Sequence, residues 1–162
     1  MRSLVLASLL LLTAPAAAQA PAAGFRALML VTPDPAALRR AWHGPQQPPR
    51  LNVTTRARRG VPVEAMIVLS GCRAGADGKC RVTAEFSVLR PDGSLYRRPV
   101  RGTVWGKAPA APGRMMLGDG SAGFRLEAGE PTGTYRLVVK VTDEVAGVSA
   151  QAEQAVAAAE AE

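Results

Sequence analysis

The residues whose chemistry is easiest to assign in this chain are its only two cysteines, Cys72 and Cys80. Seven residues separate them, and the loop that they enclose holds two glycines between two strand-like runs. A zinc site would need further Cys or His ligands close by, and the spacing differs from the C-x-x-C motif of redox proteins. We therefore expect a structural disulfide, which would stabilise the fold by roughly 2–3 kcal/mol through loop-closure entropy.

Three other residue types could bind a ligand or a metal, but each lacks the neighbours that such chemistry needs. His43 is the only histidine, and neither a group for it to act on nor an orienting group is identifiable, so we expect an exposed or structural role. Copper binding would need several Met or His residues close together, and only Met115 and Met116 are adjacent. We expect these methionines to fill the core or a sheet edge, and we predict no metal and no cofactor.

The chain carries none of the common catalytic motifs. A serine-nucleophile elbow, an H-E-x-x-H pair, a P-loop and a dinucleotide fingerprint are all absent from the sequence. Four aspartates (Asp77, Asp92, Asp119 and Asp143) lie in or beside predicted turns, where this residue type serves turn geometry. We therefore predict no catalytic residues and a protein that is not an enzyme.

The N-terminus has the pattern of an export signal. A positive start at Arg2 precedes an apolar run at residues 4–12, and Ala16, Ala17 and Ala18 supply the small residues of a cleavage site before Gln19. The apolar run is too short to span a bilayer, and no later stretch approaches that length. We predict a signal peptide at residues 1–18, no membrane span, and a periplasmic or secreted protein in an oxidising compartment.

The net charge of +7 raises the question of an anionic partner. The arginines are scattered along the chain and are not interleaved with aromatics, of which there are only two Trp, two Tyr and three Phe. We therefore exclude nucleic acid as a partner and expect a solvated basic surface. Attraction to an anionic envelope polymer remains a third hypothesis, and it requires the arginines to gather on one face of the fold.

Residues 60–92 are the central stretch of the chain. Val82, Ala84 and Phe86 alternate with polar residues, and Val63, Ala65, Ile67 and Leu69 also recur at every second position. This two-residue period is typical of strands with one face on a core. Because a Gly-rich loop joins the two runs, we predict a β-hairpin whose strands pair with each other and are linked by the disulfide.

The other predicted elements follow from period and turn residues. Residues 25–31 predict a strand, Asp34 can cap a short helix at residues 35–42, and Trp42 lies four residues after Leu38 on one face of that helix. Further strands are predicted at residues 51–55, 94–105 (broken near Pro99), 114–117, 124–127, 135–143 and 150–157. Turns are predicted at residues 56–60 and 118–120, and the last strand has a composition that would also suit a helix.

A P-x-G-x-Y pattern at Pro131, Gly133 and Tyr135 precedes the alternating run at residues 135–141. It resembles the penultimate strand of immunoglobulin-like and macroglobulin-like sandwiches, where the corner Tyr hydroxyl bonds back to the backbone. With its export signal, closely spaced cysteines and this corner, the chain resembles small exported bacterial proteins of that fold. The resemblance implies an all-β immunoglobulin-like sandwich of about seven strands at residues 51–158, after an N-terminal segment at residues 19–50 and before a tail at residues 159–162.

The leading functional hypothesis is a non-enzymatic interaction or structural module of the cell envelope. Its partner would be another envelope protein, bound at a sheet edge or at an apolar surface formed by Phe25, Leu28, Leu30 and Trp42. The alternative is a carrier of a small ligand or metal that uses Trp105 and the two adjacent methionines. A pocket lined by those residues would favour the carrier, and a flat or grooved apolar patch would favour the interaction module. The sequence does not indicate the oligomeric state.

Overall fold

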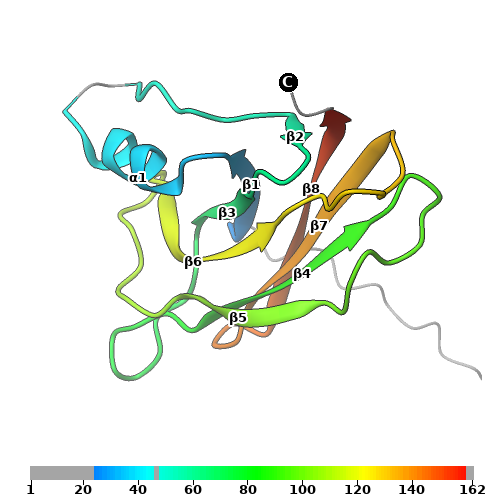
Figure 1. Cartoon of the computed structure of the whole chain (residues 1–162). Helices are drawn as coiled ribbons and strands as arrows, with labels where there is room; N and C mark the ends of the chain where they lie inside the picture. The colour runs from blue at the N-terminus through cyan, green and yellow to red at the C-terminus, as the bar shows by residue number, and fades with distance from the viewer. Residues whose placement is uncertain (1–23, 46–47, 160–162) are drawn as a thin grey trace, which may run out of the picture.

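The computed structural model describes residues 24–45 and 48–159, so the predicted signal peptide at residues 1–18 lies outside the described residues. The described residues form one helix and eight strands in two packed sheets (Figure 1). The fold is a β-sandwich with a short N-terminal helix, which confirms the predicted fold class. In chain order the elements are β1 (Arg26–Thr32), α1 (Pro35–His43), β2 (Arg56–Arg58), β3 (Val63–Ser70), β4 (Val82–Leu89), β5 (Val100–Trp105), β6 (Met116–Phe124), β7 (Thr134–Asp143) and β8 (Val148–Ala159).

The two sheets have the strand orders β1-β3-β6 and β2-β8-β7-β4-β5. Every neighbouring pair is antiparallel except β2 and β8, which are parallel. The core lies between the sheets and is filled by the residues that alternate inward, as the two-residue period predicts. On β7 these are Tyr135, Leu137, Val139 and Val141, each no more than 2% exposed.

The predicted hairpin at residues 60–92 is wrong, because β3 and β4 belong to different sheets. β3 pairs with β1 and β6, whereas β4 pairs with β5 and β7. The loop between them crosses from one sheet to the other. Alternation reports which face of a strand is buried but not which strand pairs with it, so both strands were identified and their pairing was not.

The N-terminal segment is part of the sandwich. β1 pairs with β3 along all seven of its residues, from Arg26 with Ser70 to Thr32 with Glu64. Asp34 caps α1 by accepting a hydrogen bond from the Ala37 N–H at 2.8 Å, and Leu38 is fully buried against the outer face of the three-stranded sheet. The segment that we separated at residues 19–50 therefore supplies a strand and a covering helix to the sandwich that we began at residue 51.

Residues 118–120 form part of β6, so the turn predicted there is wrong. These glycines lie where β6 passes close to the backbone of β5. A Cβ built on Gly120 would lie 2.6 Å from the Thr103 carbonyl oxygen, and one on Gly118 would lie 3.1 Å from the Val104 carbonyl oxygen. The glycines allow the two sheets to approach at this side of the sandwich, which we call the glycine seam (Gly118 and Gly120 of β6 against Thr103 and Val104 of β5).

Three smaller strand predictions also need correction. Residues 51–55 are not a strand, and the adjacent basic segment predicted as a turn contains β2 instead. β5 begins only at Val100, after Pro99, and Leu95 makes an isolated bridge to Leu89. Residues 125–127 follow β6 rather than forming a strand of their own. The last strand, β8, is a strand and not a helix, and it extends to Ala159.

Candidate functional site

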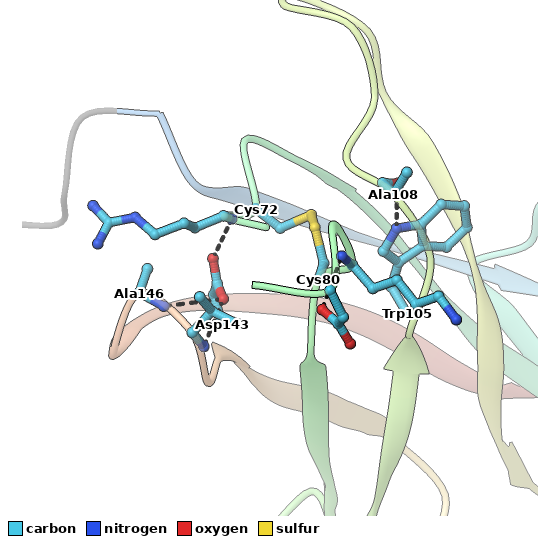
Figure 2. Close-up of a disulfide and its surroundings, with 10 residues drawn as sticks. Cys72, Cys80, Trp105, Ala108, Asp143 and Ala146 are labelled. Carbon is cyan, nitrogen blue, oxygen red and sulfur yellow. Dashed lines mark hydrogen bonds between the residues drawn. A yellow bond between two sulfur atoms is a disulfide. The ribbon is translucent and has the colours of Figure 1, made fainter. Parts of the chain in front are cut away.

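Cys72 and Cys80 form a disulfide within the loop that crosses between the sheets (Figure 2). Both residues are buried, and their Cα atoms are 6.0 Å apart. The N–H of Cys80 donates to the Lys107 carbonyl oxygen at 2.8 Å, which connects the loop to the segment after β5. A buried bond with these contacts supports the fold and offers no accessible thiol for redox chemistry.

Asp143 is a fully buried carboxylate at the end of β7, close to the disulfide. Its Oδ2 accepts from the Arg73 N–H at 2.7 Å, and its Oδ1 accepts from the N–H groups of Val145 at 3.0 Å and Ala146 at 3.2 Å. The carboxylate therefore shapes the β7–β8 turn and connects it to the crossing loop (Figure 2). The sequence indicated the turn role of Asp143 but gave no sign of its hydrogen bond with the Arg73 N–H.

Tyr135 lies at the start of β7, with its side chain fully buried. Its hydroxyl donates to the Pro131 carbonyl oxygen at 2.9 Å, and its ring meets those of Tyr96 and Phe124 at centroid distances of 6.0 and 5.7 Å. Burial raises the pKa of Tyr135 above its usual value of 10.0, and the Glu130 carboxylate adds to this effect. Gly133, just before β7, has a φ of 125° and lies against Pro91.

The predicted interaction surface of Phe25, Leu28, Leu30 and Trp42 is not a single exposed surface. Phe25 is only 7% exposed and belongs to the main core. Leu30 and Trp42 are partly buried against the small cluster beneath α1, and only Leu28 is well exposed, at 51%. The prediction failed because β1 turns one face to the core and α1 covers part of the other face.

On the side that faces away from β7, most of β8 has no strand partner in the described part of the chain. The Ala158 N–H donates to Gly133 on the β7 side, whereas the Ala157 N–H donates to Thr55 on the opposite side. The N–H and C=O of a strand residue point to the same side and alternate along the strand. The backbone groups of four earlier residues therefore point away from β7, and β2 covers only the last three residues of β8. These residues are Ser149, Gln151, Glu153 and Ala155.

A second candidate site is an open depression with a volume of about 410 Å³ near the C-terminal end of α1. Three segments that are far apart in the sequence meet there: the end of α1, the end of β5 and the start of β6. We call it the double-tryptophan depression, because both tryptophans of the chain line it. Its lining residues are Trp42, His43, Gly44, Trp105, Arg114, Met115, Met116 and Leu117. The residues named for the carrier hypothesis, Trp105, Met115 and Met116, therefore meet at one depression, which is the observation that favours a carrier.

The arginines lie on strands of both sheets and on α1, so they do not gather on one element of the fold. Several pair with acidic side chains, such as Arg101 with Glu144 at 3.0 Å on β5 and Arg136 with Glu153 at 3.4 Å on β7. Exposed pairs of this kind contribute little to stability. The hypothesis of a polymer-binding face gains no support from this distribution.

Two further properties concern the residues that the structure describes. Among residues 24–45 and 48–159, no group of three or more His, Cys, Asp or Glu side chains is placed to hold a metal ion. Within the same ranges, α1 is the one helix, and it is too short to cross a membrane.

Comparison with known proteins gives distant structural similarities only. No protein-family model matches the sequence, and no match to a curated protein was found. The CARDB domain of PF1109 from Pyrococcus furiosus superposes with a TM-score of 0.45 at 12% identity, covering 85% of this chain and 94% of that one.

Two other solved structures are similar to the same degree. A family 123 glycoside hydrolase from Clostridium perfringens gives a TM-score of 0.49 at 12% identity, over 85% of this chain and 27% of the hydrolase. The sporulation control protein Spo0M from Bacillus subtilis gives 0.40 at 15% identity, over 67% and 46% of the two chains. At this level the likeness concerns the arrangement of strands and does not extend to activity.

Proposed function

We propose that this chain is a non-enzymatic, extracytoplasmic interaction module that binds another envelope protein by accepting a strand along the free edge of β8. The observation that carries the proposal is the row of outward backbone groups from Ser149 to Ala155, none of which has a backbone partner among the described residues. Main-chain hydrogen bonds to such an edge supply the affinity in β-strand addition.

The β8 edge lacks the features with which proteins usually protect a free strand. Residues 148–155 contain no proline and no lysine, and their one charged residue, Glu153, lies 3.4 Å from Arg136 on β7. The side chains that alternate outward are small or polar, so they would not obstruct an incoming backbone. Edges that are long, regular and weakly charged are the ones that pair with another chain.

The other free edges are less suitable, and β6 meets the β5 backbone at the glycine seam. β1 directs the backbone groups of Ala27 and Met29 outward, but the Thr54 N–H already occupies the neighbouring Val31 carbonyl oxygen. On β5, the Thr103 carbonyl oxygen faces the glycine seam, which leaves little room for a strand there. β2 has three residues and ends with an arginine on each side.

The extracytoplasmic location is supported by the signal-like N-terminus and by the disulfide between Cys72 and Cys80. Such bonds persist in oxidising compartments and are rare in reducing ones. An envelope protein is therefore the class of partner that the chain would meet.

The test compares two substitutions at one residue of the β8 edge. Gln151→Pro removes an outward N–H and places a ring on the edge, whereas Gln151→Ala leaves the backbone unchanged. Because this N–H points away from β7, both variants keep the β7–β8 pairing. The tagged proteins are expressed in their own envelope, lightly crosslinked, captured and identified by mass spectrometry, and thermal unfolding confirms that each variant is folded.

The proposal expects one recurrent partner that is retained by the parent and by Gln151→Ala and lost by a folded Gln151→Pro. Equal capture by all three proteins would show that the edge of β8 is not the binding surface. The absence of any recurrent partner of the parent would contradict the interaction role itself.

A further inference from the structure

The double-tryptophan depression has the composition of a ligand site, and it lies apart from the β8 edge. Trp42 and His43 come from the end of α1, Trp105 from the end of β5, and Arg114 and Met115 from the segment that leads into β6. Its volume of about 410 Å³ falls within the range of small-molecule sites. Both tryptophans of the chain are only partly buried against the core clusters.

The aromatic walls of the depression are held in place by contacts within the fold. The Trp105 Nε1–H donates to the Ala108 carbonyl oxygen at 3.1 Å, as Figure 2 shows. The Lys107 ammonium lies 5.1 Å from the centre of the same ring and 2.9 Å from an Asp119 carboxylate oxygen. Trp42 packs against the cluster beneath α1. Since the Trp105 N–H is already bonded, that ring can offer a ligand only its apolar surface.

The charge around the depression is positive. No acidic residue lines it, and within the described residues the Arg114 side chain makes no hydrogen bond or ion pair that would neutralise it. A bound metal cation would meet this positive charge, whereas an anion would be attracted to the guanidinium. Guanidinium groups pair with carboxylates in a planar geometry with two parallel hydrogen bonds.

We infer that the double-tryptophan depression binds a ring-bearing carboxylate, with the apolar face of the ring against tryptophan and the carboxylate at Arg114. Two sources share this chemistry: an acidic sugar of an envelope polysaccharide and a free aromatic acid. The exposed Met115, at 41%, adds a flexible apolar side chain that can adjust to either ring. This inference does not rest on strand addition at β8.

The two tryptophans provide a specific measurement, because the chain has only two indole N–H groups and both belong to residues of this site. In a ¹H–¹⁵N spectrum of the full mature protein, these two signals are followed during titration with trigalacturonate and with 2-naphthoate. Maltotriose and 2-naphthalenemethanol serve as the matched neutral probes. The inference expects saturable shifts of the indole signals with at least one carboxylate and at least tenfold weaker binding of its neutral counterpart.

Two variants test the role of the guanidinium. Arg114→Gln should weaken binding of the carboxylate by about tenfold, which corresponds to the loss of one charge-assisted hydrogen bond at an exposed site. Arg98→Gln removes the same charge from an exposed residue outside the depression, and it should leave the affinity within twofold of the parent. Binding of trigalacturonate alone identifies an acidic sugar as the source of the ligand, and binding of 2-naphthoate alone identifies a free aromatic acid. Binding of both supports recognition of a ring-bearing carboxylate from either source.

Three results would overturn the inference. The first is no saturable shift with either carboxylate at millimolar concentration. The second is equal binding of the neutral probes, which would show apolar adhesion without recognition of the carboxylate. The third is unchanged affinity in Arg114→Gln, which would remove the group on which the recognition depends.

Discussion

Adding one methyl group at Gly120 should destabilise the sandwich, while the same change three residues later should not. The Cβ of Gly120→Ala would lie 2.6 Å from the Thr103 carbonyl oxygen and 3.3 Å from both the Cα and the Cγ1 of Val104. Gly123 lies on the same strand, and a Cβ built there meets no atom within 4 Å. The pair therefore separates the effect of the glycine seam from the general effect of replacing glycine in a strand.

The size of the effect follows from the contacts. To restore an ordinary contact of about 3.4 Å, the backbones of β5 and β6 would have to separate by roughly 0.8 Å at this point, because the nearest atom, the Thr103 carbonyl oxygen, belongs to the backbone and cannot rotate away. Overpacking of this kind costs about 1–3 kcal/mol. Alanine regains about 0.5–1 kcal/mol over glycine through the lower entropy of the unfolded chain. We expect a net loss of up to about 2.5 kcal/mol for Gly120→Ala and a small gain for Gly123→Ala, so that the two variants differ by about 1–3 kcal/mol.

Denaturant unfolding of the oxidised protein measures both free energies, provided that the transition is two-state. In a thermal melt, the loss in Gly120→Ala corresponds to a fall in Tm of up to roughly 10 °C for a domain of this size. If Gly120→Ala is as stable as Gly123→Ala, then β5 and β6 do not approach as closely as described, and the account of the seam is wrong.

Three further perturbations test the supports of the crossing loop and of β7. Replacing Cys72 and Cys80 together by serine should lower the free energy of unfolding by roughly 2–3 kcal/mol in denaturant titration, whereas a loss below about 0.5 kcal/mol would contradict the loop-closure argument. Asp143→Ala leaves three backbone N–H groups without their acceptor and should cost about 2–4 kcal/mol, while a neutral result would mean that water replaces the carboxylate. Tyr135→Phe removes the hydrogen bond to Pro131 and should cost about 1 kcal/mol below pH 10. Burial raises the pKa of Tyr135, so the neutral phenol contributes stability below the pKa of the unfolded state, and that stability is lost as the pH rises through the higher pKa of the folded state. In a pH series of melts, the difference in Tm between the parent and Tyr135→Phe should therefore narrow above pH 10.

Features that depend on nearby residues were predictable from the sequence. The two-residue period identified β3, β4 and β7, since that period is a direct consequence of strand geometry, and it identified the buried faces of β4 and β7. The second face of β3, expected in water, is buried too, because Met66 and Val68 lie beneath α1. The Asp34 cap and the helix after it were also predictable, because the capping bond joins residues three apart. The spacing of Cys72 and Cys80 was enough to predict a disulfide without knowing which strands flank it.

Features that depend on which elements pack or pair with each other were not predictable from the sequence in this way. Nothing in the alternation of β3 distinguishes pairing with β4 from pairing with β1 and β6. Gly118 and Gly120 suggested a turn, although their spacing of two places both on one face of a strand and was a usable signal for a close approach. Trp42 and Trp105 lie far apart in the sequence, so only the position of α1 on the sheet brings them to one depression.

The pairing of β2 with β8 has a consequence for the order of folding. It joins Arg56 to Ala157, so about a hundred residues must be present before this contact can form. Contacts between residues so distant in the sequence form slowly, because the entropy of closing a long loop must be overcome first. We therefore expect β2 to join the sheet late, after β7 and β8 have paired with each other, because Asp143 and Val148 pair across a short turn.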